Sequence, residues 1–239
     1  MFDYDAELRG YREAFRTACG IRPGDRVLDV GCGAGQTTRD AGRDAAPGAV
    51  LGVDVAERML EHARANTSDD NVRYVLADAT TYDFEPVDVV ISRFGVMFFD
   101  DPARAFRNLR RAARRVVFLV WQPRAENEWA RAIPEAIGGS FRDDSPFSLG
   151  DPDTTRRLMT DAGFTEPTFT ALREPLYYGP DVESAYENVL QLREPQTLLA
   201  GLDPADGDRA RAALRETLKA HQTADGVQFG SAAWIIRTE

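Results

Sequence analysis

Apolar and amphipathic segments alternate along the first half of the sequence. Short apolar runs such as VVFLV predict strands, because strands buried on both faces need not alternate with polar residues. The predicted strands cover residues 26–30, 49–54, 71–78, 87–94 and 114–121. Amphipathic segments between them predict helices over residues 35–46, 56–66 and 102–113. This alternation predicts a parallel sheet with helices on both faces.

The remaining segments are less regular. An amphipathic helix is expected over residues 4–19, and Asp101 is expected to cap the helix that begins at Pro102. In the second half, the pattern predicts a capped helix over residues 151–164 and a strand over 167–178. Two helices are expected over 181–193 and 204–221, and a last strand over 226–238. Without an internal repeat or a clear linker, one domain with a helical elaboration is the simplest interpretation.

The first strand runs directly into three alternating glycines. In VLDVGCGAGQTT these are Gly31, Gly33 and Gly35. Glycine loses more conformational freedom on folding than any other residue, so the cluster predicts a sharp bend or close contact with a ligand. Open parallel sheets bind ligands beyond the carboxyl ends of their strands. We therefore interpret this segment as a binding loop; a tight turn without a ligand is the alternative.

Acidic residues end the next two strands. Asp54, about 20 residues beyond the glycines, stands where a carboxylate can accept both hydroxyls of a ribose. Asp78 could accept from the exocyclic amine of an adenine. Taken alone, each has an ordinary explanation, as an acid at a helix N-terminus or as a turn residue. Asp29 lies inside the first strand, where a buried carboxylate needs hydrogen-bond donors.

The sequence of the loop also indicates which kind of nucleotide ligand it would bind. Its glycines follow G-x-G-x-G rather than the G-x-G-x-x-G of dinucleotide sites, and it lacks the lysine of a Walker loop. A ligand with adenosine, an ammonium and a carboxylate but no phosphate suits these residues. S-adenosylmethionine is such a ligand, and S-adenosylhomocysteine is its demethylated product.

Four segments resemble the successive motifs of class I S-adenosylmethionine-dependent methyltransferases. They are VLDVGCGAGQTT, VLGVDVAERML, NVRYVLADAT and VISRFGVMFFDDPARAFRNLRRAAR. The resemblance extends over residues 4–130, and it is closest to the ubiquinone/menaquinone-biosynthesis-type and natural-product small-molecule methyltransferases. The resemblance implies a doubly wound, Rossmann-like α/β fold with a seven-stranded, mostly parallel sheet and an antiparallel last strand. A single domain, 1–239, would comprise a cofactor-binding half (1–121), a substrate-side elaboration (122–225) and the last strand (226–239).

The resemblance also implies which residues contact the methionine part of the cofactor. The three loop glycines would face the methionine part and the ribose, with Asp29 near the amino group. Ser92 and Arg93 would lie beside the methionine moiety. Gln36 and Thr37, at the start of the following helix, are further candidates.

The nucleoside would be held by residues after the second and third strands. Asp54 would take the ribose diol, and Val55 and Met59 would flank the adenine. Asp78 would meet the adenine amine, with the amide of Ala79 at a ring nitrogen.

Two features depart from the family pattern. The Pro-Gly-Gly turn before the fifth strand is missing, so that connection is shortened. Ser92 stands where metal-dependent catechol-type enzymes have an acid, and the tetrapeptide resembling NPPY of nucleobase and amide N-methyltransferases is absent. Capping explains Asp101, which leaves one spare carboxylate at Asp100, and no metal is expected.

The methyl acceptor is expected to be a small, apolar or aromatic metabolite that is methylated on an O, N or C atom. Candidate walls of its pocket are Tyr4, Tyr11, Phe94, Met97, Trp121, Trp129, Phe141, Tyr177 and Tyr178. For each aromatic residue, ordinary core packing is the alternative. His221 is the one candidate for a catalytic base, and an exposed helix end is its alternative.

Composition narrows the function further. A net charge of −10 and a pI of about 4.8 disfavour nucleic acid and anionic membranes as partners. Cys19 and Cys32 have no ligand-like or disulfide spacing, which fits a reducing cytoplasm. Lys219 is the only lysine, which disfavours Schiff-base mechanisms. A non-catalytic S-adenosylmethionine-binding partner or sensor, and an NAD-dependent oxidoreductase, remain as alternatives.

Overall fold

The computed structural model describes residues 3–239 and divides into two compact units. The sheet unit comprises Arg12–Gln122, Ser145–Leu172 and Ala233–Glu239. The helical unit comprises the segment up to Tyr11, Pro123–Asp144 and Arg173–Ala232. No helix within residues 3–239 combines the length and the apolar character needed to cross a bilayer.

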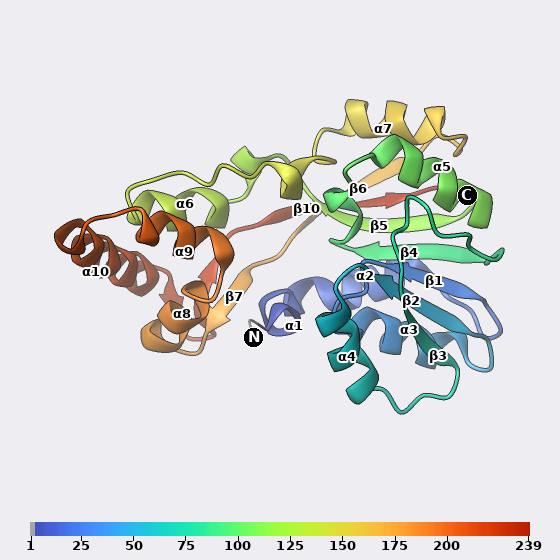
Figure 1. The fold of residues 1–239 in the computed structure, drawn as a ribbon, viewed down its shortest axis with the longest axis horizontal. Coiled ribbons are helices and arrows are strands. Elements are labelled where there is room, and N and C mark those ends of the chain that lie inside the picture. Colours follow the sequence, from blue (N-terminus) through green and yellow to red (C-terminus); the bar gives the residue numbers. More distant parts are fainter. Residues whose placement is uncertain (1–2) are drawn as a thin grey trace. The chain divides into compact units, whose positions relative to one another are not determined.

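The sheet unit contains a seven-stranded sheet in the order β3-β2-β1-β4-β5-β10-β6 (Figure 1). Its strands are β1 Val27–Val30, β2 Val50–Asp54, β3 Val72–Leu76, β4 Val89–Arg93, β5 Val116–Trp121, β6 Thr168–Arg173 and β10 Ala232–Arg237. The first five strands pair in parallel, and β10 pairs antiparallel with β5. The predicted mostly parallel sheet with an antiparallel last strand is therefore confirmed.

Helices cover this sheet on both sides (Figure 1). They are α2 Arg12–Cys19, α3 Gln36–Ala45, α4 Glu57–Ala65, α5 Pro102–Ala112 and α7 Pro152–Asp161, with the short 3-10 helices η2 Val96–Phe98 and η4 Ser145–Phe147. Asp101 caps α5 as predicted, since its Oδ1 accepts the N–H of Arg104 at 2.9 Å. Where the Pro-Gly-Gly turn is missing, residues 113–115 connect α5 to β5.

The helical unit is built on a three-stranded sheet in the order β7-β9-β8. Its strands are β7 Leu176–Gly179, β8 Gln222–Thr223 and β9 Gly226–Phe229, and both pairings are antiparallel. The helices are α1 Tyr4–Glu7, α6 Trp129–Ala136, α8 Val182–Val189, α9 Arg193–Ala200 and α10 Pro204–Ala220, with 3-10 helices η1 Arg9–Tyr11 and η3 Arg124–Glu126. α10 packs on α6 and α8, and Tyr178 meets Phe229 edge-on at 5.5 Å.

Four predicted elements are interrupted in the structure. The helix expected over 4–19 is split into α1, η1 and α2, and the helix expected over 181–193 ends at Val189 before α9 begins. The strand expected over 167–178 becomes β6 and β7, because Pro175 has no N–H to continue a ladder. The strand expected over 226–238 becomes β9 and β10, which join different sheets on either side of Gly230 and Ser231.

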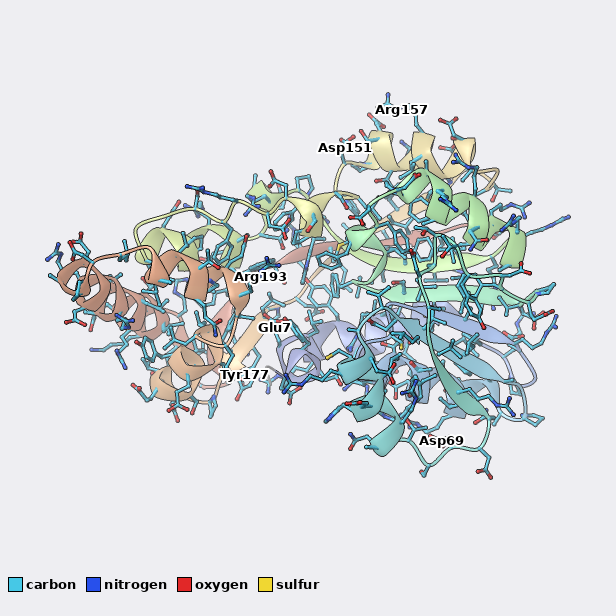
Figure 2. The ribbon with its side chains drawn as sticks, viewed as in Figure 1. Glu7, Asp69, Asp151, Arg157, Tyr177 and Arg193 are labelled. Carbon is cyan, nitrogen blue, oxygen red and sulfur yellow. The ribbon has the colours of Figure 1, made fainter. Side chains whose placement is uncertain are left out.

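The buried Glu7 is expected to make the stability of the helical unit depend on pH. Figure 2 labels Glu7 on α1 and Tyr177 on β7, against which α1 packs. Burial raises the pKa of Glu7 from its ordinary value of 4.5 to about 7. The folded protein therefore keeps the proton between pH 4.5 and 7, while the unfolded chain has lost it. The tighter binding of this proton by the folded protein contributes to the free energy of unfolding. The contribution is complete below pH 4.5 and is lost as the pH rises to 7.

We expect Glu7→Gln to reduce the loss of stability between pH 5 and 8 by up to about 3 kcal/mol relative to the wild type. Denaturant unfolding at both pH values measures this difference. The exposed Glu13 provides a matched control, and Glu13→Gln should retain the wild-type pH dependence. Equal pH dependence in the wild type and in Glu7→Gln would contradict the prediction.

Candidate functional site

All thirteen predicted cofactor residues lie in the sheet unit, around the carboxyl ends of four adjacent parallel strands. β1 ends at Val30, β2 at Asp54, β3 at Leu76 and β4 at Arg93. Asp54 pairs with Leu76 in the sheet register, and its carbonyl accepts the N–H of Ala77 at 3.0 Å. The strand order reverses between β1 and β4, which is where open α/β sheets bind ligands.

The glycine loop, residues 31–35, contains three left-handed residues. The angle φ is +68° at Gly31, +52° at Gly33 and +81° at Gly35. An L side chain in this conformation costs about 1–2 kcal/mol. The loop is anchored to β2, because Gly31 and Cys32 donate their N–H groups to the carbonyl of Val53 at 2.8 and 3.0 Å. Backbone conformation alone therefore favours glycine at all three positions.

Gly31 and Gly33 differ in the space that a side chain would find beside them. A Cβ added to Gly31 would lie 2.7 Å from the Cα of Gly95, so backbone fills that side of the loop. A Cβ added to Gly33 would meet only the Met59 methyl group within 4 Å, at 3.6 Å. Gly33 thus presents an open backbone face that a ligand can approach.

Asp54 supports the loop and also faces the edge of the sheet. Its Oδ2 accepts the N–H of Gly33 at 2.8 Å, and its Oδ1 accepts the N–H of Ala56 at 2.9 Å. Each carboxylate oxygen has a second lone pair, so both can also accept a ligand hydroxyl. Val55 and Leu76 are 72% and 51% exposed and provide apolar surface at the same strand ends.

Asp29 is a buried carboxyl with unsatisfied hydrogen-bonding capacity. Thr38 donates its hydroxyl to Oδ2 at 2.7 Å, whereas Oδ1 has no hydrogen-bond partner among residues 3–239. Burial raises the pKa of Asp29 to about 7, while Thr38 and the charge of Arg93 act in the opposite direction. A buried acceptor without a partner is costly, and a ligand ammonium would satisfy it.

Asp78 and Ala79 form a turn beyond β3. Asp78 Oδ1 accepts both the N–H and the hydroxyl of Thr80, and these bonds lower the pKa of Asp78. The buried Asn108 of α5 donates to the carbonyls of Ala79 and Tyr82 at 2.9 and 2.7 Å. The turn is therefore held in place by a side chain from a different part of the sequence.

Gln36 and Thr37 are the first two residues of α3, whereas Ser92 and Arg93 are the last two residues of β4. Arg93 donates to the side-chain oxygen of Gln36 at 2.8 Å. Thr37 and Arg93 line a cleft that also includes Arg12 of α2. Ser92 is fully buried, and its hydroxyl bonds to backbone groups.

Three predicted acceptor residues lie in the sheet unit. Phe94 has φ of +59° and is the only non-glycine residue of segment 3–239 with a positive φ. Its ring stacks on Trp121, with centroids 4.0 Å apart. The N–H of Trp121 faces the sulfur of Met97 at 3.3 Å, and all three side chains are buried.

The other predicted acceptor residues belong to the helical unit. They are Tyr4, Tyr11, Trp129, Phe141, Tyr177 and Tyr178. Tyr11 and Tyr178 are buried in the core of that unit, whereas Tyr4 is 48% exposed. The guanidinium of Arg9 lies 3.7 Å from the ring centroid of Tyr177.

His221 lies at the C-cap of α10, also in the helical unit. Its Nδ1 is 2.8 Å from the carbonyl of Thr217, and its Nε2 is 3.1 Å from the carboxylate of Glu128. The ring stacks on Phe229 at 4.0 Å. Both ring nitrogens therefore face acceptors, whereas a general base needs a nitrogen with a free lone pair directed at its substrate.

Sequence reasoning missed several residues that shape the site. Thr38 and Asn108 are buried partners of Asp29 and of the Asp78 turn, and Tyr74 fills the space where a side chain on Gly35 would lie. Phe98, just beyond the predicted Met97, is 55% exposed. Thr38 and Asn108 could have been found in the sequence, because each is a polar residue on the inner face of a predicted helix. No local sequence pattern indicated Tyr74.

The arrangement fits an adenosyl ligand with an ammonium group. It combines the open face of Gly33, the accessible lone pairs of Asp54 and the unpartnered Oδ1 of Asp29. Within residues 3–239, no group of three or more His, Cys, Asp or Glu side chains is placed to hold a metal ion.

Sequence comparison connects this region to known proteins. Residues 28–120 match the methyltransferase domain family. Demethylmenaquinone methyltransferase of Staphylococcus aureus is 32% identical over 108 residues, which cover 44% of this chain and 45% of that enzyme. The chain thus spans less than half the length of this relative.

Solved structures share the fold. A protein of Anabaena variabilis described as an antibiotic-biosynthesis methyltransferase superposes with a TM-score of 0.68 at 16% identity, covering 98% of this chain and 99% of that one. Phosphoethanolamine N-methyltransferase 2 of Haemonchus contortus, in complex with phosphomonomethylethanolamine and S-adenosylhomocysteine, gives 0.58 at 20% identity, covering 95% and 51%. Residues 28–120 therefore match a methyltransferase domain, and the chain shares its fold with these solved structures.

Proposed function

We propose that this protein transfers the methyl group of S-adenosylmethionine to a small, apolar or aromatic metabolite. The observation that carries the proposal is the buried Oδ1 of Asp29, which lacks a partner among residues 3–239, behind a glycine loop with an open face at Gly33. This combination suits a ligand that brings both an ammonium and a compact nucleoside.

The proposed binding roles follow from the donors and acceptors at the sheet edge. Asp29 pairs with the ammonium of the methionine part, and Asp54 accepts the ribose hydroxyls. Val55 and Met59 pack against the adenine, while Asp78 and the amide of Ala79 read its edge. Arg93 supplies a positive charge for the carboxylate from its position next to Gln36.

The protein contributes positioning rather than covalent chemistry. When bound, S-adenosylmethionine supplies a methyl group already activated on a sulfonium. The residues around it hold the cofactor in one orientation, align the acceptor at about 3–3.5 Å and exclude water. We assign none of the site residues the role of a base, and an acceptor that reaches the site unprotonated needs none.

The acceptor class rests on apolar residues beyond β4. Phe94, just beyond β4, stacks on Trp121 at the end of β5, and the exposed Phe98 ends η2. Pockets lined by aromatic side chains favour apolar ligands. The Staphylococcus aureus relative, named for demethylmenaquinone, supports the same class of acceptor.

Two measurements test the proposal. Calorimetry with S-adenosylmethionine, S-adenosylhomocysteine and NAD should show binding of the first two only. Radiolabelled methyl transfer to a panel of phenols, quinols, amines and carboxylates should then show turnover with an aromatic acceptor. Cofactor binding without turnover on any acceptor would favour a sensor or partner subunit, whereas NAD binding would favour an oxidoreductase.

Cofactor affinity should also depend on pH through Asp29. The pKa of Asp29 is raised to about 7 in the free protein, and an ammonium partner favours its ionised form. Binding below pH 7 must then release a proton, so affinity should weaken by up to about tenfold per pH unit as the pH falls from 7. Calorimetric titrations from pH 5.5 to 7.5 measure this slope. In Asp29→Asn the affinity should be lower and independent of pH over this range; a wild-type slope in the variant would exclude Asp29 as the titrating group.

A further inference from the structure

Ser92, the residue before the end of β4, connects two strand ends through its hydroxyl. The side chain is fully buried. Its Oγ donates to the carbonyl of Val30 at 2.6 Å and accepts the N–H of Gly95 at 3.2 Å. Val30 is the last residue of β1 and immediately precedes the glycine loop, so Ser92 bonds both to the base of that loop and to the turn beyond β4.

Backbone contacts reinforce this connection. A Cβ on Gly31 would lie 2.7 Å from the Cα of Gly95, and a Cβ on Gly95 would lie 2.6 Å from the carbonyl oxygen of Val30. The two glycines therefore bring the loop and the turn together with no side chain between them. The hydroxyl of Ser92 holds this close contact through one hydrogen bond to each side.

The loop is held from both neighbouring strands. On the β2 side, the carbonyl of Val53 accepts the N–H groups of Gly31 and Cys32. On the β4 side, the side-chain bond comes from Ser92 to Val30. Without the hydroxyl, the start of the loop would keep its β2 anchor but lose this lateral support.

The same turn contains Phe94, whose left-handed conformation costs energy for a residue with a side chain. Its N–H donates to the carbonyl of Leu119 at 2.8 Å, and its ring stacks on Trp121. Ser92 therefore links the loop proposed for the cofactor to a strained turn proposed for the acceptor.

We propose that Ser92 is a positioning residue that sets the glycine loop against the turn beyond β4, and that it does not contact the cofactor itself. This assignment rests on the proposed function and differs from the sequence-based expectation that Ser92 lies against the methionine moiety. Small misplacements of a binding or reacting group can cost up to about 100-fold in rate. We expect loss of the hydroxyl to weaken S-adenosylhomocysteine binding by about tenfold.

Thr238 offers a matched control in the same unit. It is buried, its Oγ1 donates to the carbonyl of Arg114 at 2.8 Å, and it accepts the N–H of Val116 at 3.3 Å. These are the same two kinds of bond that Ser92 makes, but they lie at the amino end of β5. Thr238→Val and Ser92→Ala should therefore lower the melting temperature similarly, whereas only Ser92→Ala should raise the Kd for S-adenosylhomocysteine.

An isosteric pair isolates the hydroxyl if Ser92→Ala fails to fold. Ser92→Thr and Ser92→Val have the same shape and differ only in the hydroxyl, so the Thr variant should bind about tenfold more tightly than the Val variant. Calorimetry well below each melting temperature provides the Kd values. Equal affinity within this pair, or wild-type affinity in a folded Ser92→Ala, would overturn the positioning role alone. Absence of binding by the wild-type protein would instead overturn the proposed function, and this inference with it.

Discussion

A Gly33→Ala variant is expected to remain folded but to bind S-adenosylmethionine about 10- to 100-fold more weakly, since overpacking typically costs about 1–3 kcal/mol. The methyl group would have ordinary contact with Met59 and would otherwise project into the open space beside the loop. Gly31→Ala should behave differently. Its methyl group would overlap the backbone of Gly95, which cannot move aside as a flexible side chain could. We expect a loss of about 2–5 kcal/mol of stability from overlap and strain together.

Gly24 provides the control for strain alone. It has φ of +94° with no atom within 4 Å of an added Cβ. Gly24→Ala should therefore cost about 1–2 kcal/mol and leave the Kd unchanged. Denaturant unfolding and calorimetry on the three variants measure both quantities. If Gly33→Ala bound as tightly as Gly24→Ala, the open face of Gly33 would not be a ligand contact.

Asp54→Ala is expected to weaken cofactor binding by about 100-fold or more, because two charge-assisted hydrogen bonds are each worth about 1.5–3 kcal/mol. The change removes the proposed acceptor for the ribose hydroxyls. It also releases the N–H groups of Gly33 and Ala56, so the loop loses part of its support. Calorimetry with S-adenosylhomocysteine measures the affinity, and thermal unfolding measures the accompanying loss of stability.

Asp88 is the matched control for the structural part of this effect. Its carboxylate accepts the N–H of Arg26 at 2.7 Å, next to the start of β1 and β4 rather than at their ends. Asp88→Ala should reduce stability without changing the Kd. An Asp54→Ala protein that binds within about threefold of the wild type would exclude the proposed ribose contact.

The fold of the sheet unit was largely accessible from sequence. Apolar runs located the five parallel strands, and Asp101 marked the start of α5, because these features depend on local periodicity and capping. The sequence did not reveal where a predicted strand or helix is interrupted, because the hydrophobic pattern continues across the point at which the segment changes its packing partner. The segment 226–238 reads as one strand, yet β9 and β10 join separate sheets.

For the candidate site, the sequence alone determined which residues lie at or just beyond the strand ends: the three glycines and the acids Asp54 and Asp78. Those positions follow from strand length and chain order, which are local properties. Only the tertiary structure decided which side of the loop is open. Gly31 is blocked by Gly95 and Gly35 by Tyr74, both remote in sequence, whereas Gly33 has open space. The space around a backbone atom depends on packing between distant segments, and a local pattern does not encode it.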